Sequence, residues 1–230
     1  MKANFIFKNR EDASLQLLNI LPKEILQPNE TVVLGVSEGG IFFADKIASF
    51  LNCRVDILLS EPIISEVNPE LAIAVVGETE EIVMNKSLIN SFNISKDYIY
   101  SQAHHKYKEE ILRYINKYRD GLVLNGLNNK FVILVDESVE TGLSMMTAIK
   151  TVISLGAKTV FVAVPILDNI VYKSLVKICD DIFCPYKIDD YIDKEYYYKE
   201  LEPFSFEEIE HIMQKSKKIE DRKQKGKNRK

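Results

Sequence analysis

The most informative part of the chain is residues 131–166, FVILVDESVETGLSMMTAIKTVISLGAKTVFVAVPI. It begins with a continuously apolar, β-branched run, which is typical of a strand buried on both faces of a parallel sheet. This run ends in two acids, Asp136 and Glu137. A short loop, the tetrapeptide TGLS and a helical pattern follow, before a second buried strand at 159–166. A strand, a helix and a strand in this order predict a parallel α/β unit.

Two more apolar runs extend the same pattern towards the N-terminus. They are TVVLGV at 31–36 and VDILLS at 55–60, and helical patterns occur at 41–51, 143–155 and 168–178. Strands that alternate with helices indicate an α/β domain whose crossovers are right-handed. We therefore expect a mostly parallel, twisted sheet flanked by helices.

Residues 61–128 interrupt this alternation, and we interpret them as an insertion. LAIAVVGE at 71–78 and EIVMN at 81–85 are joined by a short turn, which predicts an antiparallel hairpin. A long helical pattern then runs from Ser95, a suitable N-cap, to Gly121, a suitable stop. The insertion is expected to fold over one end of the main sheet.

Length and composition are those of an ordinary folded domain. The 230 residues are 46% hydrophobic and 28% charged and include three cysteines. A chain of this size buries a core without disulfides, and an odd number of cysteines without a CxxC pair favours a reducing compartment. The first residues lack the apolar segment of a signal peptide, and no run reaches the ~18 apolar residues of a membrane span. We expect a cytoplasmic protein without membrane contact.

The net charge of −4 is distributed unevenly. Residues 214–230 carry nine Lys and Arg side chains and two acids, whereas the preceding 213 residues carry a net charge of −11. We expect one domain over residues 1–213, followed by a basic, disordered tail over 214–230. Of these two parts, only the tail is suited to nucleic acid.

The acids and the loop after residue 135 have the chemistry of a phosphosugar site. In parallel sheets, ligands bind at the carboxyl ends of the strands. The backbone N–H groups that open the following helix attract phosphate, Gly142 permits a close approach, and Thr141 and Ser144 supply hydroxyl groups. Two adjacent carboxylates suit a pair of neighbouring hydroxyls or a divalent cation. A phosphorylated sugar satisfies all of these features together.

The run VILVDESVETGLS resembles the phosphoribosyl-pyrophosphate (PRPP) motif of type I phosphoribosyltransferases. It has the apolar strand, the two acids, three variable residues and Thr-Gly-x-Ser in the same order. VVLGVSEGGIFFADKIASFL at 32–51 resembles the first active-site loop of that family. Residues 68–85 and the long helix after them resemble a bacterial subgroup of predicted phosphoribosyltransferases. The resemblance covers most of residues 5–210.

The resemblance implies a role for each matching position. Asp136 and Glu137 would hold the ribose hydroxyls of PRPP. The 5-phosphate would lie in a loop made of Ser138, Val139, Thr141, Gly142, Leu143 and Ser144. Pyrophosphate would lie against Glu38, Gly39 and Gly40. The family also implies a homodimer, a nitrogenous base as second substrate, and Mg²⁺ bound mainly through PRPP without a protein metal site of its own.

Three acids depart from the family pattern. Glu38 occupies a position that usually holds Arg or Lys, and Glu61-Pro62 follows the second strand where the subgroup has a basic pair. A carboxylate near a polyanion weakens its binding. Glu140, in contrast, precedes the Thr-Gly pair, as does an acid in family members that act on 6-oxopurines. There it would be the catalytic residue, exchanging a proton with the base.

These departures leave alternatives open. The first is a phosphoribosyltransferase for a purine-like or related base. The second is a catalytically lapsed relative that binds a nucleotide or a phosphoribosyl ligand as a regulator. The third is a structural or partner-binding protein. In the aromatic segment 190–204, Tyr191, Tyr196, Tyr197 or Tyr198 is a candidate to stack on a base, or to pack against the insertion.

Overall fold

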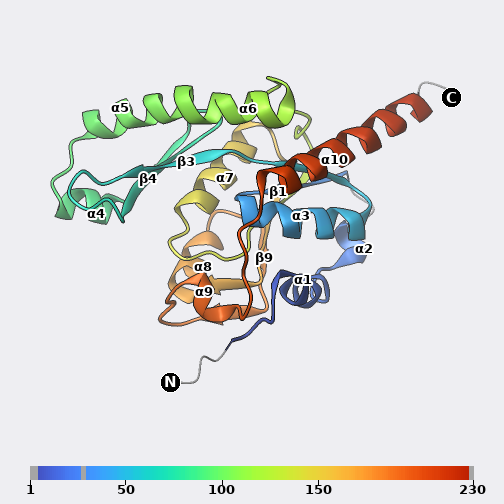
Figure 1. Cartoon of the computed structure of the whole chain (residues 1–230), viewed down its shortest axis with the longest axis horizontal. Helices are drawn as coiled ribbons and strands as arrows, with labels where there is room; N and C mark the ends of the chain where they lie inside the picture. The colour runs from blue at the N-terminus through green and yellow to red at the C-terminus, as the bar shows by residue number, and fades with distance from the viewer. Residues whose placement is uncertain (1–4, 27–29, 228–230) are drawn as a thin grey trace.

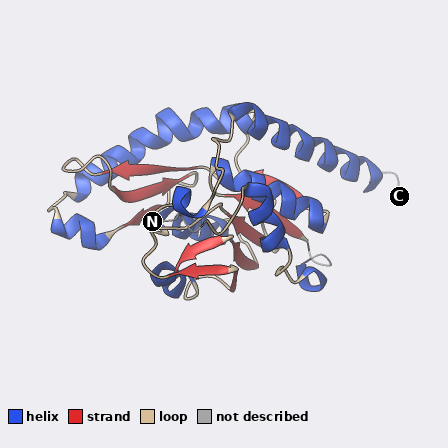
Figure 2. Ribbon diagram, turned by 60° about the horizontal axis from the view of Figure 1, so that its bottom comes forward, coloured by secondary structure: helices blue, strands red, loops and turns tan. Residues whose placement is uncertain are grey.

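The computed structural model describes residues 5–26 and 30–227, with side chains described as far as Lys217. Within them, a five-stranded parallel sheet of order β2-β1-β6-β7-β9 forms the centre of the molecule (Figure 2). Its strands are β1 Thr31–Gly35, β2 Arg54–Ile57, β6 Phe131–Val135, β7 Thr159–Ala163 and β9 Asp181–Phe183. The predicted α/β fold with a mostly parallel sheet is confirmed. Each of the four predicted apolar runs contributes a strand to this sheet, although Ser60 and Ile166 already belong to strands of other sheets.

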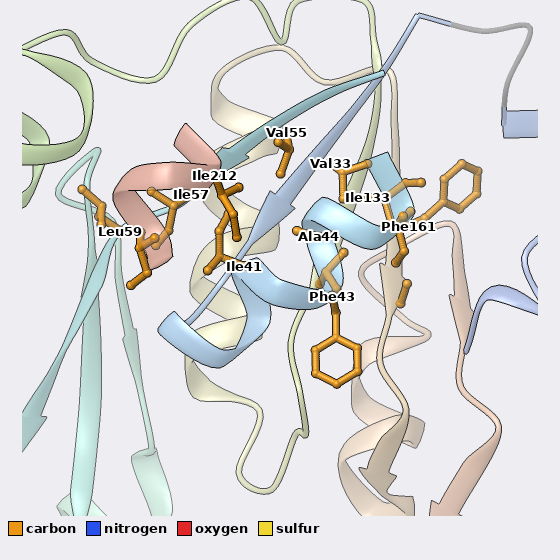
Figure 3. Close-up of a cluster of buried hydrophobic side chains, with 14 of the residues drawn as sticks. Val33, Ile41, Phe43, Ala44, Val55, Ile57, Leu59, Ile133, Phe161 and Ile212 are labelled. Atoms are coloured by element: carbon orange, nitrogen blue, oxygen red, sulfur yellow. The ribbon is translucent and has the colours of Figure 1, made fainter. Parts of the chain in front are cut away.

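Helices cover both faces of the main sheet (Figure 1). One face packs against α1 Arg10–Leu18, α3 Glu38–Leu51 and α10 Phe206–Lys227, and the other against α7 Leu143–Ser154. Alternate strand residues contribute to the two cores, because successive side chains of a strand point to opposite faces. Val33 and Ile133 belong to the core beneath α3 (Figure 3), and Leu34 and Leu134 to the core beneath α7.

The strand order contains a switch point between β1 and β6. From β1 the chain passes through α3 to β2 on one side, and later enters β6 on the other side of β1. The helices that follow these two neighbouring strands therefore lie on opposite faces. A crevice at the carboxyl ends of such strands is the usual ligand position in open α/β sheets.

The predicted hairpin is present, within a second sheet of three antiparallel strands. Its strands are β3 Ser60–Ile64, β4 Ala72–Gly77 and β5 Ile82–Met84, in the order β3-β4-β5. The sequence pattern did not separate β3 from the strand before it, because VDILLS is one continuous apolar run. Val75 and Val83 of this sheet pack against α7, whereas Ala74 and Val76 face the core that includes the long helix.

The long helix lies across the three-stranded sheet (Figure 1) and has a π-helical turn at its centre. Its segments are α5 Lys96–Lys106, the π-helical turn η1 Tyr107–Ile111 and α6 Leu112–Arg119, and the short α4 Lys86–Ser91 precedes it. Ser95 is the N-cap, and its side chain accepts from the Tyr98 N–H at 3.1 Å. The helix ends at Arg119, and its C-cap Asp120, one residue before the predicted stop, has a left-handed backbone.

Helix α10 differs from the sequence prediction, which placed a disordered tail from residue 214. The helix continues through this boundary to Lys227. Lys215 pairs with Asp45 at 2.9 Å, and the buried Ser216 hydroxyl donates to the Val55 carbonyl at 2.6 Å. The start of the basic segment therefore covers the edge strand β2 and donates to its Val55 carbonyl.

Short elements complete the described chain. They are α2 Lys23–Leu26, β8 Ile166–Asp168, α8 Asn169–Leu175, β10 Tyr186–Ile188 and α9 Lys194–Tyr197. Strands β8 and β10 form a parallel pair beside the main sheet. None of the helices in the described part of the chain is long and apolar enough to cross a bilayer.

Candidate functional site

The loops after β1 and β6 meet at the switch point. The Ser37 hydroxyl, after β1, donates a hydrogen bond to Oδ1 of Asp136, after β6. The two segments are 99 residues apart in sequence. The structure thus brings together the two stretches that the sequence analysis selected.

The first segment is the start of a helix, and the predicted loop there is wrong. Ser37 is the N-cap of α3, and its hydroxyl accepts from the Gly40 N–H at 2.9 Å. Neither Gly39 nor Gly40 has a positive φ. A Cβ at Gly39 would lie 2.3 Å from the carboxylate carbon of Glu137, and one at Gly40 would lie 2.6 Å from a carbonyl oxygen of β6. These glycines therefore allow α3 to approach the acids closely.

Asp136 is partly buried at the centre of the site. Its Oδ1 accepts from the Ser37 hydroxyl and, at 2.8 Å, from the N–H of Glu137. The pKa of Asp136 is raised to about 7, mainly by burial; the Ser37 hydrogen bond lowers it and the adjacent Glu137 carboxylate raises it. Within the described residues no hydrogen bond uses Oδ2, which leaves this oxygen available to a ligand hydroxyl.

Glu137 is buried, with 4% of its surface exposed, and two cations neutralise it. Arg10 Nε lies 2.9 Å from Oε2, and Lys194 Nζ contacts Oε1. The Tyr198 hydroxyl also donates to the Glu137 backbone carbonyl at 2.9 Å. Sequence reasoning missed Arg10 and Lys194, because they lie 127 and 57 residues from Glu137 and belong to no motif.

The end of the loop after β6 and the first turn of α7, residues 140–144, form a cradle of backbone N–H groups. Val139 bridges to β8, which fixes the middle of the loop. Gly142 has φ +75°, and a Cβ there would lie 2.5 Å from a Val171 methyl. No side chain caps α7, and in the described part of the chain no acceptor bonds the backbone N–H groups of residues 140–144. Such an uncapped helix N-terminus is suited to an anion such as phosphate.

Polar side chains border this cradle. The hydroxyls of Thr141 and Ser144 have no hydrogen-bond partner within the described residues, and Thr141 is exposed. Glu140 is also exposed. Incomplete hydration still raises the pKa of its carboxyl group, as do the nearby carboxylates of Asp193 and Asp168. A raised pKa brings a carboxyl group closer to the range in which it can exchange protons near neutral pH.

A small cavity of about 100 Å³ adjoins the start of α3. The carboxylates of Glu38 and Glu61 line it, together with the rings of Tyr114 and Tyr118 from α6. Lys106 lies 3.6 Å from Glu61, and burial raises the pKa of that carboxyl group. Two of the three acids that depart from the family pattern, Glu38 and Glu61, therefore share one cavity.

The aromatic segment after β10 packs mainly against the N-terminal residues. Tyr197 and Tyr198 are buried, and the ring centroids of Tyr198 and Phe7 are 4.9 Å apart. These two rings are therefore not available to stack on a base. Tyr196 is 38% exposed, and Tyr191 is partly buried.

Comparisons with known proteins agree on one family. Residues 8–200 match the model described as "Phosphoribosyl transferase domain". Two Mycobacterium tuberculosis proteins, from strains CDC 1551 / Oshkosh and H37Rv and each named "Putative phosphoribosyl transferase", are 26% identical over 179 residues. These matches cover 78% of this chain but 40% of each relative, so the chain spans less than half the length of these relatives.

A solved structure shows the same fold. TT1426 from Thermus thermophilus superposes with a TM-score of 0.71 at 26% identity, covering 90% of this chain and 97% of the other. The fold, the switch-point site and the family match together define an α/β protein of the phosphoribosyltransferase class. The chain belongs to the phosphoribosyl transferase domain family.

Proposed function

We propose that the chain binds PRPP at the switch point and transfers its phosphoribosyl group to a purine-like or related nitrogenous base. One observation supports this most strongly. The unbonded N–H groups at the start of α7 lie directly after two carboxylates in the chain. A phosphate would suit the N–H groups, and vicinal hydroxyls would suit the carboxylates.

In this proposal the 5-phosphate binds the loop from Ser138 to Ser144, helped by the hydroxyls of Thr141 and Ser144. The ribose hydroxyls donate to Asp136, through its unbonded oxygen, and to Glu137. Pyrophosphate lies at the start of α3, against Gly39 and Gly40. Arg10 and Lys194, which pair with Glu137, keep its charge compensated in a buried position.

The reaction breaks the bond between the anomeric carbon and pyrophosphate and forms a bond from that carbon to a ring nitrogen of the base. The nitrogen loses a proton, and Glu140 is the acceptor that lies beside the phosphate cradle. Fixed N–H groups and the acids stabilise the oxocarbenium-like centre and hold its ribose in place. The products are a nucleotide and pyrophosphate.

The residues present fit Mg²⁺ that arrives with the substrate. Asp136 and Glu137 already contact Ser37, Arg10 and Lys194, and the described residues include no cluster of three or more acidic, His or Cys side chains that could hold a metal ion. Magnesium bound to phosphates commonly keeps several waters and takes few protein ligands. When bound, it would neutralise charge on the departing pyrophosphate.

The second candidate is a catalytically lapsed regulator that binds a nucleotide or a phosphoribosyl ligand. Glu38 and Glu61 favour it, because both line the cavity beside the proposed pyrophosphate position. Glu38→Arg tests whether the pyrophosphate group of bound PRPP lies beside residue 38. We expect Mg²⁺-PRPP to bind about 10-fold more tightly to the variant, since a repulsive charge becomes attractive. Glu38→Gln should give a smaller gain, and an unchanged affinity in both variants would show that Glu38 does not face pyrophosphate.

Release of pyrophosphate during incubation with Mg²⁺-PRPP and single bases tests the enzyme proposal. We expect one purine-like or related base to give turnover, and Glu140→Gln to lower kcat by about 10²-fold or more, as for the loss of a general base. Glu195→Gln, an exposed acid near Glu140, is the matched control and should retain activity. PRPP binding without turnover on any base would instead support the regulator. A homodimer remains a prediction, which sedimentation of the same samples checks.

A further inference from the structure

A second and larger cavity lies at the outer edge of β2. Its volume is about 420 Å³, which is within the range of small-molecule sites. It lies between the start of β2, the end of α6 with the segment after it, and the middle of α10. These elements are neighbours in Figure 1, where α6 and α10 pass above β1 and α3. None of the residues assigned to PRPP lines this cavity.

The side chain of Arg119, which lines this cavity, is more than nine-tenths buried and only partly hydrogen-bonded. Nη2 pairs with the buried carboxylate of Glu78. Nε and Nη1 are buried and have no hydrogen-bond partner among the described residues. Buried donors require acceptors, because they have lost their hydration.

The charges around the cavity are otherwise matched. Arg54 donates to Asp56, and at the rim Lys117 lies 3.6 Å from Glu210 and Lys217 lies 2.6 Å from Asp120. Each carboxylate that lines the cavity therefore already has a cationic partner. Among the described residues that line the cavity, the buried side-chain groups without a hydrogen-bond partner are Nε and Nη1 of Arg119 and the hydroxyl of Tyr118. An acceptor on a bound ligand would satisfy the Arg119 donors.

Another part of the lining is apolar and exposed. Leu122 and Val123 are 61% and 63% exposed, although both line the cavity. Large apolar side chains with this exposure gain from contact with an apolar ligand group. The two rim ion pairs join exposed side chains, so each contributes little stability and can rearrange around a ligand.

We propose that this cavity binds a small anionic molecule of phosphate or carboxylate chemistry. Its anionic group accepts hydrogen bonds from Arg119, and its apolar part contacts Leu122 and Val123. Charge-assisted hydrogen bonds to a guanidinium group are among the strongest that a buried site offers. The site adjoins the smaller cavity at the start of α3, because Tyr118 lines both. Glu78, the partner of Arg119, also accepts from the Leu59 N–H at 3.1 Å, and Leu59 lines the smaller cavity.

Nuclear magnetic resonance of the ¹⁵N-labelled full chain tests this proposal, with phenyl phosphate, inorganic phosphate and benzoate as anionic probes. Benzyl alcohol is the neutral control. We expect saturable shifts of the Arg119 Nε–H and of the Leu122 and Val123 amides with phenyl phosphate, and binding about 10-fold tighter than that of inorganic phosphate. Benzyl alcohol should not saturate these signals. The amide of Gly142 reports separately on anions that bind the loop before α7.

Variants localise the binding. The double variant Arg119→Gln, Glu78→Gln removes both members of the buried pair and should weaken the binding of phenyl phosphate at least 10-fold. Arg113→Gln, on the exposed side of α6, should leave this affinity unchanged. At the exposed Val123, Val123→Asp should weaken binding and Val123→Lys should strengthen it, without a change to the buried pair. The proposal is overturned if phenyl phosphate at 10 mM shifts no signal at residues 119–123. Shifts confined to Gly142 and its neighbours, or unaffected by either Val123 variant, would also overturn it.

Discussion

At Asp136 the fold favours the protonated carboxyl group, since burial raises its pKa from 3.8 to about 7. Between these two values the native state binds more protons than the unfolded state does. The free energy of unfolding therefore falls as pH rises through this window. The hydrogen bonds from Ser37 and the Glu137 N–H limit the cost of ionisation without removing it.

Asp136→Asn removes this titration and keeps an oxygen for both hydrogen bonds. We expect the variant to gain about 1–3 kcal/mol of stability relative to the wild type between pH 5 and pH 8. Urea denaturation at the two pH values measures this difference. Asp97→Asn, at an exposed position in the first turn of α5, should follow the wild-type pH dependence. If the free energy of unfolding changed equally between pH 5 and pH 8 in all three proteins, Asp136 would be ionised in the native state throughout this range.

Gly39 determines how closely α3 approaches the second acid. Gly39→Ala places a methyl group 2.3 Å from the Glu137 carboxylate carbon, so the buried acid and its two cations must move. We expect the free energy of unfolding to fall by about 1–3 kcal/mol, although alanine forms helices better than glycine does. Ser49→Ala, on the exposed surface of the same helix, should be neutral or slightly stabilising. A Tm of Gly39→Ala higher than that of the wild type would contradict the close packing of α3 against Glu137.

At the scale of elements, α10 is part of the core. Ile209 is fully buried in the cluster that also contains α3, and Ser216 is bonded to β2. Ile209→Ala should lower the free energy of unfolding by about 2–4 kcal/mol, because it removes buried methyl groups and leaves a cavity. His211→Ala, on the exposed side of the helix, should change it by less than about 0.5 kcal/mol. Equal stabilities in chemical denaturation would mean that α10 is only loosely attached.

The elements predicted from the sequence are those whose local residue pattern matches their burial in the fold. Strands such as 131–135 are apolar throughout because both faces are covered, and Ser95 caps its helix with its own side chain. The extent of α10 was not predicted, because the lysines after Met213 suggested solvent, whereas Ser216 is buried against β2. Strand β3 was missed because no turn residue separates it from VDILLS.

The site was predicted only where it lies within a continuous motif. Asp136, Glu137 and Gly142 could be placed from one stretch of sequence, since the strand, the acids and the helix start follow one another. Arg10 and Lys194 come from other parts of the chain and meet Glu137 only through the fold. The conformation of Gly39 and Gly40 was also misjudged, because the same residues that allow a tight turn allow a close helix approach.

For the whole molecule, the account depends on the switch point. The order β2-β1-β6-β7-β9 places the start of α3 and the loop before α7 at one crevice. The family match covers residues 8–200, which include both of these segments. The central claim is therefore that this crevice binds PRPP.

Calorimetric titration of the full chain with Mg²⁺-PRPP tests this claim most directly. The wild type should bind, and Asp136→Asn with Glu137→Gln should lose at least 10-fold in affinity, because both proposed ribose contacts are weakened. Glu80→Gln with Glu81→Gln, an adjacent acid pair in the β4–β5 turn, is the matched control and should bind as the wild type does. An absence of wild-type binding at millimolar PRPP, or equal affinity in all three proteins, would contradict the account.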